Sequence, residues 1–389
     1  MPLASPFAAD FLNLEWPLLL ECCSLPLNST KISAFVGNLR GSESLLRLAD
    51  DHGVLAHLAA AFAKVPDGRI PAALLDSLRS RHRRQVVFTL AMTAELLRVI
   101  PLLQQSGIGA LAIKGPALSA RAFGDPAMRR FADIDLLVRQ KHMTLAAKAL
   151  CAAGYQSRIK PESIRAGKIP GEYLFWRPHT RIILELHTEL TFRHFPRPIP
   201  LENYFLRQTS LFLDGYAVPV LAAEHEFLLL AVHGAKDFWA RLMWVSDVAA
   251  MVHNCPELDW SILRESAAEV GATRMLRMAL LLSERTLGVR VPDQMKQEVA
   301  RDSGCARLVT QIETWLPYAG YVIPSVAQRA LFRFRMGGSG MAGARYLARL
   351  LFSPSEEDWS ADDGIAGTGL AQALRRPFRL AKKYRRPEP

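Results

Sequence analysis

Cysteine is scarce in this sequence, and its spacing excludes two kinds of site. The 389 residues include five cysteines, and no two of them are spaced as Cys-x-x-Cys. An odd number without that spacing is typical of reduced thiols and argues against a disulfide framework or a cysteine-ligated zinc site. We therefore expect a cytoplasmic protein whose cysteines fill the core as small apolar residues.

Long uninterrupted hydrophobic runs are also missing. Leu18-Leu19-Leu20 is far too short to span a bilayer, and no other run reaches the required length without a charge. Near the N-terminus, Asp10, Glu15 and Glu21 interrupt the basic and then apolar pattern that a secretory signal needs. We expect no integral membrane segment. The sequence also lacks internal repeats.

What the chain has in excess is apolar residues and positive charge. Half of the residues are apolar, which is enough for a large core in two or three domains. The net charge of +11 favours anionic partners, such as nucleotides, nucleic acid or an anionic membrane surface. Two basic clusters contribute, at Arg79–Arg84 and at Arg375–Arg386. Each is equally explained by a solvated helix face, because neither carries interleaved aromatics or a nucleic-acid-binding motif.

Hydrophobic periodicity divides the chain into four regions. Apolar spacing predicts helices in residues 1–105, the longest over 74–103, and again in residues 216–320. Residues 106–215 alternate short strands with helices, which predicts a small α/β unit. Residues 321–389 form a basic C-terminal tail region.

The middle region opens with a strand and a glycine turn. Ala110–Ile113 is a short apolar strand that leads into Lys114-Gly115-Pro116. Pro116 is well placed in the first turn of a helix, which we expect to continue to Phe123. Backbone amides of such a turn can approach a triphosphate, and the helix adds the positive end of its dipole.

Asp133 and Asp135 are the most informative residues of the chain. They lie two residues apart on a predicted strand that ends at Val138, so their side chains share one face. Oxygen ligands of this kind suit Mg²⁺ or Mn²⁺. Taken alone, the pair is more typical of a solvated strand end or turn, because a lone Asp-x-Asp is common.

Context strengthens the metal hypothesis. A later strand, Arg181–His187, brings a third carboxylate, Glu185, with His187 on the same face. Three acids on adjacent strands can hold two Mg²⁺ ions, which clamp the attacking and leaving oxygens of an in-line phosphoryl displacement. His187 is as well suited to a structural hydrogen bond as to a role in catalysis.

Basic residues close to these elements could offset phosphate charge. Lys114 and Arg129 are candidates, although Lys114 could be solvated and Arg129 could pair with Asp125 or another acid. Lys236, on a later helix, is a further candidate for contact with the triphosphate. For Asp247 we expect a buried polar pairing that fixes the helical domain to the core.

Several short motifs occur in the order typical of the uncharacterised nucleotidyltransferase family in the polymerase-β-like superfamily, which this chain resembles. In the α/β unit they are Ile113-Lys114-Gly115, Asp125-Pro126, Arg129, Asp133–Val138, Gly154-Tyr155 and Glu185-Leu186-His187. In the helical part they are His233-Gly234-Ala235-Lys236, Trp239, Arg241-Leu242 and Trp244-Val245-Ser246-Asp247. The likeness covers roughly residues 40–260.

The resemblance implies an α+β fold, with a small mixed-sheet nucleotidyltransferase core between N-terminal and C-terminal helical regions. It implies that Asp133 and Asp135 bind Mg²⁺ or Mn²⁺, that Glu185 is the third carboxylate ligand, and that Glu185 helps to deprotonate the acceptor. The superfamily usually has Gly-Ser or Gly-Gly at the turn, whereas this chain has Gly115-Pro116. Proline removes an amide donor, so Lys114 would have to compensate in a different phosphate cradle.

Three functions follow from these observations. The leading hypothesis is transfer of a nucleoside monophosphate from a nucleoside triphosphate, such as ATP, to an unknown acceptor hydroxyl on a small molecule, protein or RNA. The second is an inactive nucleotide-binding or scaffold protein with the same fold, which the Gly115-Pro116 departure favours. The third is a nucleic-acid-binding protein driven by its basic surface.

Overall fold

The sheet is built from strands far apart in the sequence. The computed structural model describes residues 14–37, 39, 42–66, 68–157, 161, 172–178, 180, 182–188, 195–197, 199–318, 324–353 and 373–380. Seven strands form one mixed sheet in the order β3-β4-β5-β2-β1-β7-β6. The strands are β1 Ala110–Ala112, β2 Ile134–Val138, β3 Gln156–Ser157, β4 Glu172–Trp176, β5 Ile183–His187, β6 Thr209–Leu213 and β7 Tyr216–Val220.

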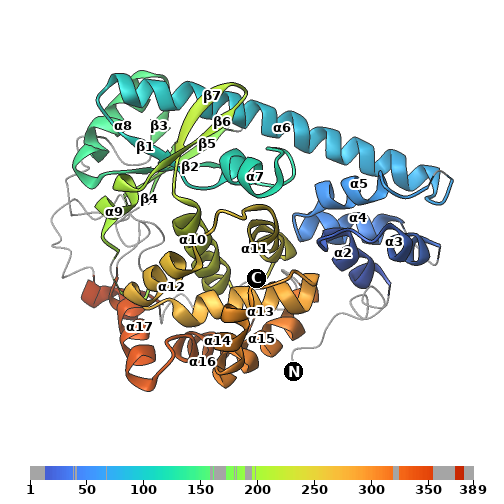
Figure 1. Ribbon diagram of the computed structural model, residues 1–389. Coiled ribbons are helices and arrows are strands. Elements are labelled where there is room, and N and C mark those ends of the chain that lie inside the picture. The colour runs from blue at the N-terminus through green and yellow to red at the C-terminus, as the bar shows by residue number, and fades with distance from the viewer. Residues whose placement is uncertain are drawn as a thin grey trace.

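Helices flank this sheet on both sides in the sequence, which confirms the predicted α+β class (Figure 1). The N-terminal helices are α2 Glu15–Cys23, α3 Ser29–Val36, α4 Ser42–Asp51, α5 Leu55–Phe62 and α6 Ala72–Gln105. Within the α/β unit lie α7 Gly115–Phe123, α8 Met143–Ala152 and α9 Leu201–Leu206. The later helices are α10 Ala223–Lys236, α11 Leu242–Asn254, α12 Trp260–Glu269, α13 Thr273–Leu287, α14 Asp293–Ala300, α15 Ser303–Trp315, α16 Val326–Met336 and α17 Gly340–Phe352.

The sheet is larger than the sequence analysis predicted, because β4 and the β6–β7 hairpin were missed. Asp214 and Gly215 form the turn of that hairpin, and both have positive φ, at 50° and 79°. Asp-Gly between two β-favouring runs is a strong hairpin signal, so the sequence did carry it. β7 lies just beyond residue 215 and pairs in parallel with β1, which brings the start of the later region into the sheet.

The two faces of the sheet contact different cores. Ile134, Leu136 and Val138 of β2 pack into a cluster with buried residues of α6 and α8. Leu137, on the opposite face, belongs to a second cluster that includes residues of α10 and α11. Asp135 alternates with the first set along the strand, so its side chain faces the later helices.

The long helix α6 runs along the sheet and on to the N-terminal helices (Figure 1). Among the described residues it is the one helix long and apolar enough, by length and composition, to cross a membrane. Its apolar part carries Glu95 and Arg98, which pair with each other at 2.7 Å, and Glu95 also accepts a hydrogen bond from Tyr155. Because its buried residues pack on the sheet, its composition is that of a core helix.

A buried ion pair joins the α/β unit to the later helices. Arg129 Nε donates to Asp247 Oδ2 over 2.9 Å, and both side chains are at most 5% exposed. Asp247 lies on α11, whereas Arg129 lies in the loop between α7 and β2 and donates its amide to Ser119 Oγ. The expected buried pairing of Asp247 is thus confirmed, and its partner is Arg129.

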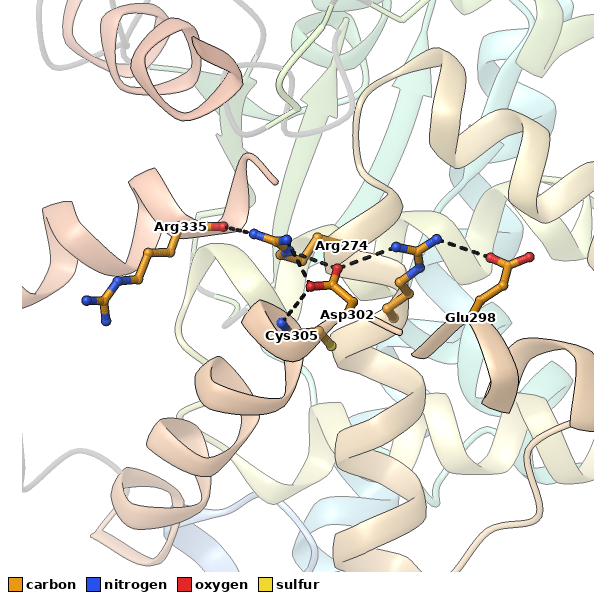
Figure 2. Close-up of polar contacts among 6 residues, drawn as sticks. Arg274, Glu298, Asp302, Cys305 and Arg335 are labelled. Atoms are coloured by element: carbon orange, nitrogen blue, oxygen red, sulfur yellow. Dashed lines mark hydrogen bonds and ion pairs between the residues drawn. The ribbon is translucent and has the colours of Figure 1, made fainter. Parts of the chain in front are cut away.

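The later helices are held to one another by a second polar network (Figure 2). Asp302 caps α15 through the amide of Cys305 and receives two hydrogen bonds from Arg274 of α13. Arg274 also donates to the carbonyl oxygen of Arg335 over 2.7 Å, and Arg335 lies on α16. The network therefore fastens the C-terminal helix α16 to the body of the protein.

A left-handed turn follows α10. Phe238 and Trp239 both have positive φ, at 57° and 53°, which is a strained conformation for bulky residues. The Trp239 ring is fully buried and folds back against Gly234, where an added Cβ would lie 2.6 Å from the ring. Arg333 of α16 stacks on the Phe238 ring at 4.8 Å. The turn is therefore held by packing on both sides.

We predict that Gly234→Ala destabilises the fold. The new methyl group overlaps the Trp239 ring, and overpacking of this kind costs about 1–3 kcal/mol. Gly340→Ala is the control, because an added Cβ there meets nothing within 4 Å. Denaturant unfolding measures both variants, and equal midpoints would show that the turn tolerates the added methyl group.

We also predict strong coupling between Arg129 and Asp247. Asp247→Leu leaves the guanidinium buried without its partner, which costs about 3–5 kcal/mol. The double variant Arg129→Met with Asp247→Leu removes both charges and is expected to be more stable than Asp247→Leu alone. Denaturant unfolding measures the free energy of each variant. If the loss in the double variant equals the sum of the losses in Arg129→Met and Asp247→Leu, the two residues are not coupled.

Candidate metal and nucleotide site

Strand register brings two of the predicted acids together. β2 and β5 are parallel neighbours, and Asp135 is directly paired with Glu185. Side chains of paired residues point to the same face of a sheet, so both carboxylates project toward the later helices. His187, two residues after Glu185, lies on the same face.

Asp135 is the centre of this cluster. Its side chain is 5% exposed, and Oδ1 lies 2.8 Å from His187 Nε2 and 3.7 Å from Lys114 Nζ. His187 Nε2 also lies 3.6 Å from Glu185 Oε2. One ligand atom from each of Asp135, Glu185 and His187 falls within 4.8 Å of the others. Such a convergence of donor atoms is compatible with a bound cation.

The charges of these groups are strongly linked. Burial alone would raise the pKa of Asp135, but Lys114 and the hydrogen bond from His187 hold it well below its usual range. Burial alone would lower the pKa of His187, but its hydrogen bonds to Asp135 and Glu185 raise it to about 9. At neutral pH the structure therefore favours a charged His187 beside an ionised Asp135.

Asp133 lies immediately before β2 and is partly exposed. Burial and repulsion from Asp135 and Glu185 raise its pKa to about 7, although Lys114 and Arg129 act in the opposite direction. Burial likewise raises the pKa of Glu185, with Asp135 adding to the effect. The three predicted acids thus share one electrostatic environment, while the tightest set of ligand atoms contains His187 in place of Asp133.

Glu172 is a member of the cluster that the sequence analysis missed. It opens β4 and is directly paired with His187 across the antiparallel β4–β5 ladder. Burial acts to raise its pKa, but the charge of His187 and a hydrogen bond with Glu185 keep it below its ordinary value. The alternation of Tyr173 and Phe175 with outward-facing Glu172 and Leu174 was the signal that could have revealed this strand.

The glycine turn lies beside these acids. The amide of Ile113 donates to the carbonyl of Asp135, and Gly115 opens α7 with a φ of 60°. A Cβ on Gly115 would be 3.7 Å from the Asp133 carbonyl oxygen, which is ordinary contact. The positive φ, rather than a lack of space, is therefore what calls for glycine here. Pro116 occupies the first turn of α7, as predicted.

Three predicted basic residues surround the cluster at different depths. Lys114 is 12% exposed and pairs with Asp135, so it is not a solvated strand end. Arg129 directs Nε to Asp247 and acts electrostatically on Asp133 and Lys114. Lys236, at the end of α10, lies 3.7 Å from Asp237. Its charge helps to lower the pKa of Glu172.

The donor set fits a divalent cation. Carboxylate oxygens are the ligands that Mg²⁺ and Mn²⁺ prefer, whereas His187 could bind Mn²⁺ only after it loses its proton. Burial and repulsion from Asp135 and Glu185 keep the pKa of Asp133 raised, even with Lys114 and Arg129 acting in the opposite direction. A divalent ion between the acids would favour the ionised form of each one.

Comparison with known proteins gives one family. A model of the uncharacterised nucleotidyltransferases matches residues 40–288. The crystal structure of an antigenic nucleotidyltransferase-like protein from Paracoccidioides brasiliensis is similar at 16% identity, with a TM-score of 0.33, over 52% of this chain and 93% of that chain. No curated protein matches. The resemblance found in the sequence is confirmed: this chain belongs to the uncharacterised nucleotidyltransferase family.

Proposed function

We propose that this protein transfers a nucleoside monophosphate from a nucleoside triphosphate to an acceptor hydroxyl and releases pyrophosphate. Membership of the family supports nucleotidyl transfer in general. The observation that carries the finer proposal is the pairing of Asp135 with Glu185 on parallel strands, with Asp133 and the start of α7 beside them. The cytoplasm is the proposed location, in keeping with five cysteines that form no disulfide.

Asp133, Asp135 and Glu185 are the proposed ligands of Mg²⁺ or Mn²⁺. When bound, the metal would supply positive charge to the phosphate oxygens and lower the pKa of an attacking hydroxyl. His187 holds Asp135 by a 2.8 Å hydrogen bond and so fixes the direction of its carboxylate. Orienting partners of this kind raise the metal affinity of ligands.

The residues around the acids are suited to the triphosphate. The amides at the start of α7 and its dipole favour an anion, and Lys114 offsets the donor that Pro116 lacks. Arg129 and Lys236 add positive charge at two further edges of the site. Catalysis would then rest on positioning and charge stabilisation.

The proposed reaction needs no nucleophile from the protein. The acceptor oxygen forms a bond to the α-phosphorus, the bond from that phosphorus to the bridging oxygen breaks, and pyrophosphate leaves with the electron pair. Glu185 is the proposed acceptor of the hydroxyl proton, because burial raises its pKa and so makes its carboxylate a better proton acceptor.

We predict that Asp135→Asn abolishes transfer. Removal of a residue that only orients a metal ligand typically costs about 10–100-fold in activity. Asp135 is a proposed ligand itself, so its loss should reduce the transfer rate by at least about a hundredfold. Purified protein with α-³²P-labelled nucleotides, Mn²⁺ and cell extract reports transfer to an acceptor. Glu265→Gln, an exposed substitution on α12, is the control. Nucleotide binding by wild type without transfer to any component would support the scaffold alternative.

Stability should depend on pH through Asp133. Its pKa in the folded protein, about 7, is above the ordinary value of 3.8. Its contribution to the free energy of unfolding is therefore fully present below pH 3.8 and is lost as the pH rises through 7. Metal-free protein should therefore lose stability across this window, and Asp133→Asn should lose less. Added Mg²⁺ should raise the melting temperature of wild type most above pH 7, because metal and proton compete. An equal Mg²⁺ effect at pH 5 and pH 8 contradicts this assignment.

A further inference from the structure

The positive charge of this chain is concentrated at its C-terminal end. Residues 324–389 hold twelve basic and six acidic residues, a net charge of +6 out of the total of +11. The acids occur in the connecting sequence 356–363 and at Glu388, outside the described residues. Within α17 and the helix over residues 373–380 there are five arginines and no acid. This end of the protein is therefore complementary to an anionic partner.

The same two helices expose large apolar side chains. Met341 of α17 is 75% exposed, and Phe378 of the last helix is 79% exposed. With Leu351, Phe352 and Leu374 they account for five of the thirteen exposed large hydrophobic residues in the described part of the chain. We call the exposed residues of these two helices the C-terminal surface.

Spacing places apolar and basic residues on the same exposed faces. Met341, Arg345, Ala348 and Phe352 are all exposed and follow one another by four, three and four positions along α17, which is one helix face. Leu374 and Phe378 are likewise four positions apart on the last helix. Arg376 Nε donates to the carbonyl of Leu350, so the two helices meet at the end of α17 (Figure 1).

The surface rests on a firmly packed support. Gly343 of α17 lies so close to α16 that an added Cβ would be 2.3 Å from the carbonyl oxygen of Phe334. α16 is in turn fastened to α13 by the Arg274 hydrogen bond to Arg335 (Figure 2). The inner side of α17, including the fully buried Tyr346, is therefore occupied by the protein itself. The outer side is the one left for a partner.

We infer that the C-terminal surface binds an anionic phospholipid membrane from one side, without crossing it. Arginine beside leucine and phenylalanine on an exposed helix face is the composition of helices that lie in the lipid interface. Guanidinium groups contact headgroup phosphates, while the apolar side chains enter the boundary of the acyl region.

The composition of the surface favours lipid over other partners. Met341, Leu351 and Leu374 are aliphatic and cannot stack on nucleic-acid bases, whereas acyl chains accept them. A symmetric contact between two copies would bring two arginine-bearing surfaces together, and neither helix carries an acid to pair with Arg345 or Arg375. An anionic bilayer accepts the exposed Arg345 and Arg375 together with the exposed apolar residues.

Vesicle co-sedimentation of the full-length protein tests this inference. The protein should sediment with vesicles of equal parts phosphatidylcholine and phosphatidylglycerol, but not with pure phosphatidylcholine, and salt should weaken the binding. Each arginine near an anionic surface contributes about a fivefold factor, so Arg345→Glu with Arg375→Glu should weaken binding by at least about twentyfold. Leu351→Ser with Phe378→Ser should also release the protein.

Two control variants test whether vesicle binding depends on the C-terminal surface or only on the overall charge and hydrophobicity of the protein. Arg47→Glu with Arg83→Glu changes two exposed arginines on α4 and α6, and Val87→Ser with Leu90→Ser changes two apolar residues of α6 that are 62% and 63% exposed. Both should leave vesicle binding unchanged. Three results would overturn the inference. The protein could bind neutral vesicles equally well, or fail to bind anionic ones. It could also bind single-stranded RNA tightly in a way that Leu351→Ser with Phe378→Ser does not affect.

Discussion

Repulsion among carboxylates on one face of the sheet is the constraint on which the rest of this site depends. Asp135 and Glu185 are forced together by the β2–β5 register, with Asp133 and Glu172 at their borders. Lys114 and His187 offset part of the charge, because both reach Asp135 within 4 Å. Burial, and then repulsion from Asp135 and Glu185, still raise the pKa of Asp133. A fold that keeps so many acids close together in a partly buried place is suited to a cation and to the anionic substrate that a cation attracts.

Two buried connections keep this arrangement fixed. The Arg129–Asp247 ion pair attaches the loop before β2 to α11, so the acids cannot move independently of the later helices. On the other side, the left-handed turn after α10 holds Lys236 and Asp237 near the sheet, with Arg333 of α16 packed on Phe238. The proposed metal ligands, the residues proposed to contact phosphate and the C-terminal helices are thus parts of one packed body.

Much of this could be predicted from the sequence, because local signals were strong. The alternation around Asp133 and Asp135, the glycine turn at Gly115 and the amphipathic repeat of α6 each defined an element within a few residues. Tertiary pairing was harder to predict. Glu172 joins the site through its register with His187, and Arg129 finds Asp247 118 positions away; neither relation leaves a periodic pattern. The Asp214-Gly215 turn is a strong hairpin signal, but it lies at the expected boundary between two regions, and no strand was predicted there.

The contact between Gly234 and Trp239 has a consequence for how this family can diverge. Because the indole ring occupies the space above residue 234, a side chain there and a tryptophan at 239 exclude each other. The two positions should therefore change together or not at all among related chains. Lys236 lies between them. The substitutions that this turn tolerates are therefore limited by the packing of Gly234 against Trp239, which involves neither the proposed metal nor the proposed substrate. A chain that loses the glycine should also have lost the tryptophan, and with it the turn that follows Lys236.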